Sequence, residues 1–94
     1  MTLRDLFPEV KFDFTPAKQF DRVLDEMVEA EEALLAQDKD HFLEEVIDVL
    51  HTAANVLYKA GYTDKQIKDK IYHVQAKNYA RGKYLCQDQY TKKN

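Results

Sequence analysis

The chain is poor in residues that interrupt helices and in residues that cross-link a fold. Its 94 residues include two glycines, two prolines, one cysteine and no tryptophan. So few glycines and prolines allow few turns and favour long helices. Because Cys86 has no second cysteine to pair with, a disulfide framework within the chain is excluded, which agrees with a reducing compartment.

Long apolar runs and a strong charge bias are missing as well. No stretch approaches the roughly 18–20 apolar residues of a membrane span, and the N-terminus lacks the basic-then-apolar order of a signal peptide. The net charge of −3 is unlike the basic field of a nucleic-acid-binding protein. We therefore expect a cytoplasmic protein with neither membranes nor nucleic acids as partners.

The length limits the core, and the charges are unevenly placed. A chain of this size forms one domain and buries roughly 60–65% of its unfolded surface, so the core of one copy is marginal. Acidic residues crowd positions 25–48, whereas residues 59–94 hold nine Lys or Arg against three Asp. A second copy would enlarge the core, and the acidic and basic regions could share a metal-bound, anionic ligand.

Hydrophobic periodicity predicts an all-α fold built on a helical hairpin. Thr15 and Pro16 suit the N-cap and first position of a first helix. That helix ends at a polar break, residues 37–40, where either Asp38 or Asp40 can cap the next helix. The second helix is expected over about residues 40–60, with Gly61 after its C-terminus.

A third helix and the two chain ends complete the expected organisation. Thr63 and Gln66 form a capping box that begins the third helix. Residues 1–14 are interpreted as an extended N-terminal arm laid over the bundle or over a partner, because Val10, Phe12 and Phe14 alternate with charged residues. Leu3, Leu6 and Phe7 could form one apolar turn at its start. The helical domain then covers residues 15–84, and residues 85–94 form a polar tail.

Two pairs of carboxylates carry the main chemical signal. Glu26 and Glu29 are three residues apart, and so are Glu45 and Asp48. In helices each pair lies on one face, and a hairpin would bring the two pairs face to face. Oxygen ligands of this kind suit Mg²⁺ or Mn²⁺. The alternative is a solvated acidic face, but two alanines beside the first pair allow close helix contact and favour the metal site.

Polar residues elsewhere are candidate substrate contacts. Lys77 and Arg81 are four residues apart, with Tyr84 just beyond, and a lysine plus a forked guanidinium suits a di- or triphosphate. The alternative is a solvated basic helix end, which the helix dipole favours. Asn55 continues the face of the second acidic pair, and Asn78 on an apolar stripe is either a substrate contact or a satisfied core residue.

The histidines give a weaker signal. Asp48-x-x-His51 is half of a di-iron carboxylate motif, but Lys70-x-x-His73 does not supply the other half. We therefore interpret both histidines as structural or solvent-facing. A carboxylate-bridged redox-metal bundle is kept as a hypothesis that bound iron would support.

Taken together, these residues resemble the MazG-like all-α nucleoside triphosphate pyrophosphohydrolases, in particular small phage-type members. The family pattern is E-x-x-E, a gap, then E-x-x-D, and here it reads Glu26-Met-Val-Glu29, fifteen residues, then Glu45-Val-Ile-Asp48. The segment HVQAKNYARGKY resembles the later helix whose Lys and Arg hold phosphates. The match covers roughly residues 18–84 and lacks the tryptophans with which some relatives stack a base.

The resemblance implies a Mg²⁺-dependent hydrolase, with Mn²⁺ as a possible substitute, for nucleotide-pool control or house-cleaning. The four carboxylates would hold the metal, and water would attack the α-phosphorus of a (d)NTP to give (d)NMP and pyrophosphate. Glu29 is the first choice for the general base and Glu45 the second catalytic candidate. Lys77 and Arg81 would stabilise the leaving pyrophosphate. A homodimer or dimer of dimers would complete a four-helix bundle.

Two points stay open at this stage. The base could be recognised by the aromatic residues of the N-terminal arm, by Tyr58, or by Tyr79 or Tyr84. The function could also be that of a non-catalytic nucleotide-binding or helix-interaction module of the same fold.

Overall fold

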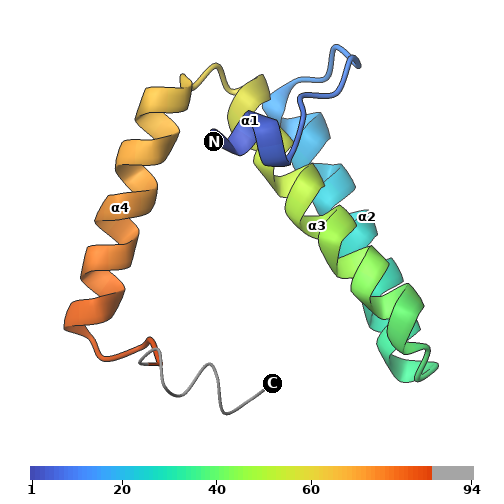
Figure 1. Ribbon diagram of the computed structural model, residues 1–94. Coiled ribbons are helices and arrows are strands. Elements are labelled where there is room, and N and C mark those ends of the chain that lie inside the picture. Colours follow the sequence, from blue (N-terminus) through green and yellow to red (C-terminus); the bar gives the residue numbers. More distant parts are fainter. Residues whose placement is uncertain (86–94) are drawn as a thin grey trace.

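A computed structural model describes residues 1–85, and every secondary-structure element in that range is helical, which confirms the all-α prediction (Figure 1). The helices are α1 (Leu3–Leu6), α2 (Pro16–Leu35), α3 (Lys39–Lys59) and α4 (Asp64–Ala80). Cys86 and nearly all of the predicted tail lie outside the described residues. Within residues 1–85, no helix has both the length and the apolar character that crossing a membrane requires.

The helices α2, α3 and α4 begin where the sequence predicts them, whereas α1 is a short helix within the segment predicted as an extended arm. The Thr15 side chain accepts a hydrogen bond from the Lys18 N–H, and Asp38 rather than Asp40 caps α3. The predicted capping box of Thr63 begins α4. Such caps satisfy N–H groups that have no partner within the first turn of a helix, so they fix the start of each element.

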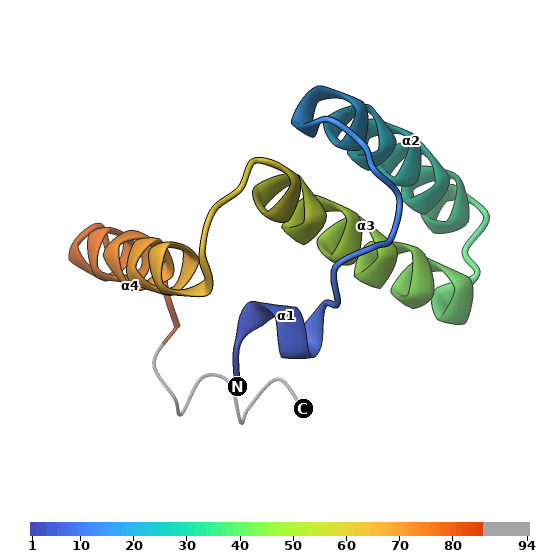
Figure 2. The same cartoon turned by 90° about the horizontal axis from the view of Figure 1, so that it is seen from above.

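α2 and α3 lie side by side as a hairpin (Figures 1 and 2). Ala30 and Ala33 of α2 are buried, and their small side chains let the two helices approach closely. Towards the open end of the hairpin, the Gln19 side-chain amide donates to the Thr52 carbonyl over 3.1 Å. The chain reverses direction at Gln37, whose φ of 59° lies in the left-handed region.

Side chains of α3 hold the backbone of residues 7–10. The hydrogen bonds run from Tyr58 Oη to Phe7 O (2.8 Å), His51 Nε2 to Pro8 O (2.8 Å), Asn55 Nδ2 to Pro8 O (3.1 Å), Val10 N to Asn55 Oδ1 (2.8 Å) and Lys59 Nζ to Val10 O (2.9 Å). Each bond satisfies a backbone group that no helix or sheet serves. The path of this segment over α3 is therefore fixed by successive turns of that helix.

A small apolar cluster lies beneath this segment. Ala54, Tyr58 and Ile67 form it, and Leu3 and Phe7 pack against it. Arg4 of α1 pairs with Asp64 at the start of α4 and lies over the Tyr58 ring, 4.2 Å from its centroid. The cluster thus joins α1, α3 and the first turns of α4, while the rest of α4 diverges from the hairpin (Figure 1).

Replacing Tyr58 by phenylalanine tests how firmly residues 7–10 are held. The change removes one hydroxyl and leaves the Phe7 carbonyl without its donor, so we expect a loss of about 1–2 kcal/mol in the free energy of unfolding. Urea unfolding followed by circular dichroism measures it. The matched control is Tyr72→Phe on α4, where the side chain is 57% exposed and no loss is expected. Equal stability of the two variants would contradict the assigned contact.

Candidate metal centre

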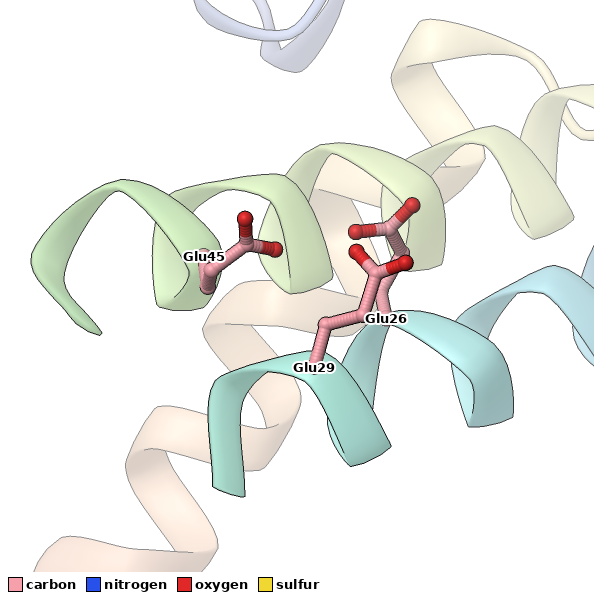
Figure 3. Close-up of side chains that lie close together, drawn as sticks. All are labelled: Glu26, Glu29 and Glu45. Carbon is pink, nitrogen blue, oxygen red and sulfur yellow. The ribbon is translucent and has the colours of Figure 1, made fainter. Parts of the chain in front are cut away.

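Three of the four predicted carboxylates converge between α2 and α3. Glu26 and Glu29 come from α2 and Glu45 from α3, and their side chains point towards one another (Figure 3). One carboxylate oxygen from each residue lies within 4.8 Å of the other two. Glu26 and Glu45 are half-buried, whereas Glu29 is exposed. A single cation between the helices can therefore contact oxygens from both of them.

Asp48 lies outside this group of three but acts on it electrostatically. The pKa of Glu26 is raised above its ordinary value of 4.5, first by burial and then by the negative charges of Glu29, Asp48 and Glu45. Among residues 1–85, no lysine or arginine forms an ion pair with any of the four. The site is thus a set of like charges that repel one another, and a bound cation would relieve that repulsion.

His41 is a site residue that the sequence reasoning missed. Its Nε2 lies 3.0 Å from Glu45 Oε1, one turn away on α3. The second oxygen of that carboxylate, Glu45 Oε2, is buried and has no hydrogen-bond partner among the described residues. A buried carboxylate oxygen without a donor is costly, so this atom is a natural position for a metal ligand. The available signal was the i, i+4 spacing of His41 and Glu45.

A pocket opens beside these residues. Its volume is about 460 Å³, and its lining includes Glu29, His41 and Glu45 together with the small side chains of Ala33 and Ala36. The pocket lies towards the turn of the hairpin. It gives the exposed Glu29 carboxylate and the half-buried Glu45 carboxylate access to the same space.

Asn55, a predicted substrate contact, is fully buried beneath residues 8–10. Its amide donates to the Pro8 and His51 carbonyls, and its oxygen accepts from the Val10 N–H. The sequence placed Asn55 correctly on the flank of Asp48, but the covering segment comes from a distant part of the chain. In this arrangement no atom of Asn55 is open to a ligand.

Of the predicted phosphate-binding residues, Lys77 lies in the last turn of α4 and Arg81 is its C-cap. The C-terminal end of α4 diverges from the α2–α3 hairpin that carries the acids (Figure 1). Lys77 and Arg81 are exposed. The Asn78 side-chain amide donates to the Tyr84 hydroxyl over 3.0 Å, and the Tyr79 and Tyr84 rings meet edge to face with centroids 4.7 Å apart. Asn78, Tyr79 and Tyr84 therefore contact one another at the end of α4, and among residues 1–85 none of these contacts reaches the acids of the same chain.

The histidines occupy separate places. His51 Nε2 donates to the Pro8 carbonyl, so in this arrangement that ring nitrogen is not free to bind a metal beside Asp48. His73 is exposed on α4.

Comparison of the chain with models of known protein families, with curated proteins and with solved structures gives no match. The resemblance to the MazG-like enzymes therefore stays a prediction, and the geometry of the site is the structural observation that bears on its chemistry. That geometry offers carboxylate oxygens from two helices, a buried oxygen without a donor and an adjacent pocket, which together can hold a hard divalent cation next to a ligand.

The raised pKa of Glu26 predicts how the metal-free protein responds to pH. Between the unfolded pKa and the higher folded pKa, the folded state binds more protons, so this group favours folding at low pH. That contribution is lost as the pH rises through the folded pKa. We expect Glu26→Gln to raise the melting temperature of metal-free protein at neutral pH and to reduce its fall as the pH rises above the ordinary pKa of 4.5.

Thermal unfolding in the presence of a chelator measures both effects. The matched control is Asp21→Asn, an exposed carboxylate of α2 outside the acidic group, which should leave the pH dependence of wild type unchanged. A Glu26→Gln protein that follows the wild-type curve would show that the four charges do not repel one another in solution.

Proposed function

We propose that this protein is a Mg²⁺-dependent nucleotide pyrophosphohydrolase that converts (d)NTP and water to (d)NMP and pyrophosphate. The observation that carries the proposal is the convergence of Glu26, Glu29 and Glu45, with Asp48 acting on the same group. Carboxylate oxygens are the ligands that Mg²⁺ prefers, and Mn²⁺ would be accepted by the same set. The metal would neutralise and orient the substrate phosphates.

The two catalytic candidates have different surroundings, which suits different roles. Glu45 is fixed by His41, and its other oxygen is buried, so it is well placed as a rigid metal ligand. Glu29 is exposed and lines the pocket, so its carboxylate can hold the proton of an attacking water. We therefore keep Glu29 as the first choice for the general base, with Glu26 and Asp48 completing the metal set.

The proposal includes a homodimer or a dimer of dimers. The flank of the hairpin opposite the acids carries apolar side chains that are 46–61% exposed, namely Phe20, Leu24, Met27, Leu34, Leu43, Ile47 and Leu50. A separate pocket of about 850 Å³ lies between α4 and the end of α3. Polar and apolar side chains both line it, and the apolar ones include Leu57, Ile67, Ile71 and Val74. Exposed apolar side chains that gather on one flank are typical of an interaction surface.

Association would also address the separation of the acids from the basic end of α4. Lys77 and Arg81 do not join the acids of their own copy, and a second copy could present its α4 to them. Paired hairpins would form a four-helix bundle, and residues 1–14 would act as an arm over that assembly. The biological role that fits this chemistry is nucleotide-pool control or house-cleaning.

The activity is tested by Mg²⁺-dependent release of pyrophosphate from a panel of dNTPs and damaged nucleotides. Glu45→Gln and Asp48→Asn should each lower kcat/KM at least about a hundredfold, because each removes a charge that holds the metal. Asp21→Asn, which changes an exposed carboxylate outside the site, should retain wild-type activity.

Two outcomes would contradict this function. If the folded wild-type protein releases no pyrophosphate from any nucleotide, the hydrolase is excluded. Nucleotide binding without hydrolysis in calorimetry would instead favour a non-catalytic nucleotide-binding module.

The dimer is tested by sedimentation and light scattering over a range of concentrations. Leu24→Glu and Leu50→Glu each replace a half-exposed leucine of the apolar flank by a charge. Burying a leucine contributes about 1.5–3 kcal/mol, so each variant should weaken association at least about tenfold. Lys18→Glu, at an exposed position of α2 away from that flank, is the control. A wild-type protein that is monomeric and fully helical at all concentrations would exclude the dimer.

A further inference from the structure

Two phenylalanines form a stacked, solvent-facing pair just before α2. The Phe12 and Phe14 rings have centroids 5.4 Å apart and planes 19° apart. Phe12 is 61% exposed and Phe14 is half-buried. A preformed aromatic stack at the surface offers a flat π face to another planar group.

The pair lies at one end of a row of charged side chains on α2. The Arg22 guanidinium is 5.8 Å from the centroid of the Phe14 ring. Arg22, Glu26 and Glu29 are spaced i, i+4 and i+7, so they share one flank of the helix. Arg22 is about 6 Å from Glu26 along the helix axis. The order along this flank is therefore aromatic pair, cation, acids.

The path of the preceding residues places the pair on the same side of the hairpin as the acids. Val10 is bonded to Asn55 and Lys59 of α3. These two residues continue the flank of Asp48, at i+7 and i+11, towards the open end of the hairpin. The chain then crosses from α3 to α2 (Figure 2). The crossing segment carries both phenylalanines past this flank.

The other aromatic candidates are poorly placed for this role. Tyr58 is 4% exposed, its hydroxyl bonds to the Phe7 carbonyl, and its ring is covered by Arg4. Tyr79 and Tyr84 pack on each other at the end of α4. Among residues 1–85, the Phe12–Phe14 pair is the stacked aromatic surface on the acidic side of the hairpin.

We propose that Phe12 and Phe14 form the stacking surface for the nucleobase of the ligand, with its phosphates directed past Arg22 to the acids. This proposal rests on the pyrophosphohydrolase function above. A nucleotide fits the row because it joins a planar aromatic group to an anionic chain that a cation and a metal attract. Phenyl rings bind any base through its π face, so the surface supplies affinity more than selection among bases.

The test compares a ligand that has a base with one that lacks it. Phe12→Leu and Phe14→Leu keep the side chains apolar but remove the flat faces. We measure KM for the dNTP that wild type hydrolyses fastest, and the inhibition constant of inorganic tripolyphosphate. Each variant should raise KM for the dNTP about tenfold and leave the inhibition constant of tripolyphosphate unchanged. Circular dichroism verifies that the helices are intact.

Tyr72→Leu is the matched control. This ring is 57% exposed on α4 and has the Lys68 ammonium 5.9 Å from its centroid, so it reproduces an exposed aromatic beside a cation away from the acids. Removing this ring should change neither KM for the dNTP nor the inhibition constant of tripolyphosphate. Unchanged KM in both phenylalanine variants, or an equal loss for dNTP and tripolyphosphate, would overturn the stacking surface.

Calorimetry separates this proposal from the proposed function. If wild type does not hydrolyse dNTPs, the proposed hydrolase activity is rejected. Calorimetric measurement of dNTP binding in the presence of Mg²⁺ then tests the stacking surface independently of catalysis. Weaker dNTP binding in Phe12→Leu, with unchanged tripolyphosphate binding, would support the stacking surface without catalysis. Wild-type protein that binds neither ligand would overturn both proposals.

Discussion

The close packing of α2 on α3 is the constraint on which the rest of the site depends. Ala30 and Ala33 let the helices approach, and the same approach places Glu26 and Glu29 opposite Glu45. The hairpin therefore holds negative charges together at the expense of its own metal-free stability, as the raised pKa of Glu26 indicates. Repulsion of this kind, kept in a partly buried place, is the feature on which the proposed cation site rests.

The helical hairpin and the acidic group were predictable because both follow from local spacing. Caps at Thr15 and Thr63 and the short break before α3 define the helices, and i, i+3 spacing then places each acidic pair on one face. Longer-range features were not accessible in this way. The burial of Asn55 depends on Pro8 and Val10, which are more than forty positions away in the chain.

The position of α4 shows the same limit. The sequence predicts its capping box and its basic C-terminal end. No local sequence pattern predicts whether the helix packs back on the hairpin or diverges from it. Arg4 and Asp64 tie its first turn to α1, and the helix then diverges (Figure 1). The hairpin accordingly keeps an apolar flank that one copy does not cover, and the phosphate-binding candidates remain separated from the acids. Local sequence signals therefore do not say which of the candidate residues one chain brings together.

The segment between Val10 and Thr15 is anchored at both ends. The Val10 N–H and carbonyl are both hydrogen-bonded to side chains of α3, and Thr15 is the N-cap of α2. The residues between them form a bridge of fixed span, because neither anchor can move without breaking a hydrogen bond or a helix start. Such a bridge tolerates a change of side chain far better than a change of length. One residue inserted or deleted there would shift Phe12 and Phe14 relative to both anchors, so the proposed stacking surface depends on the length of this short connection.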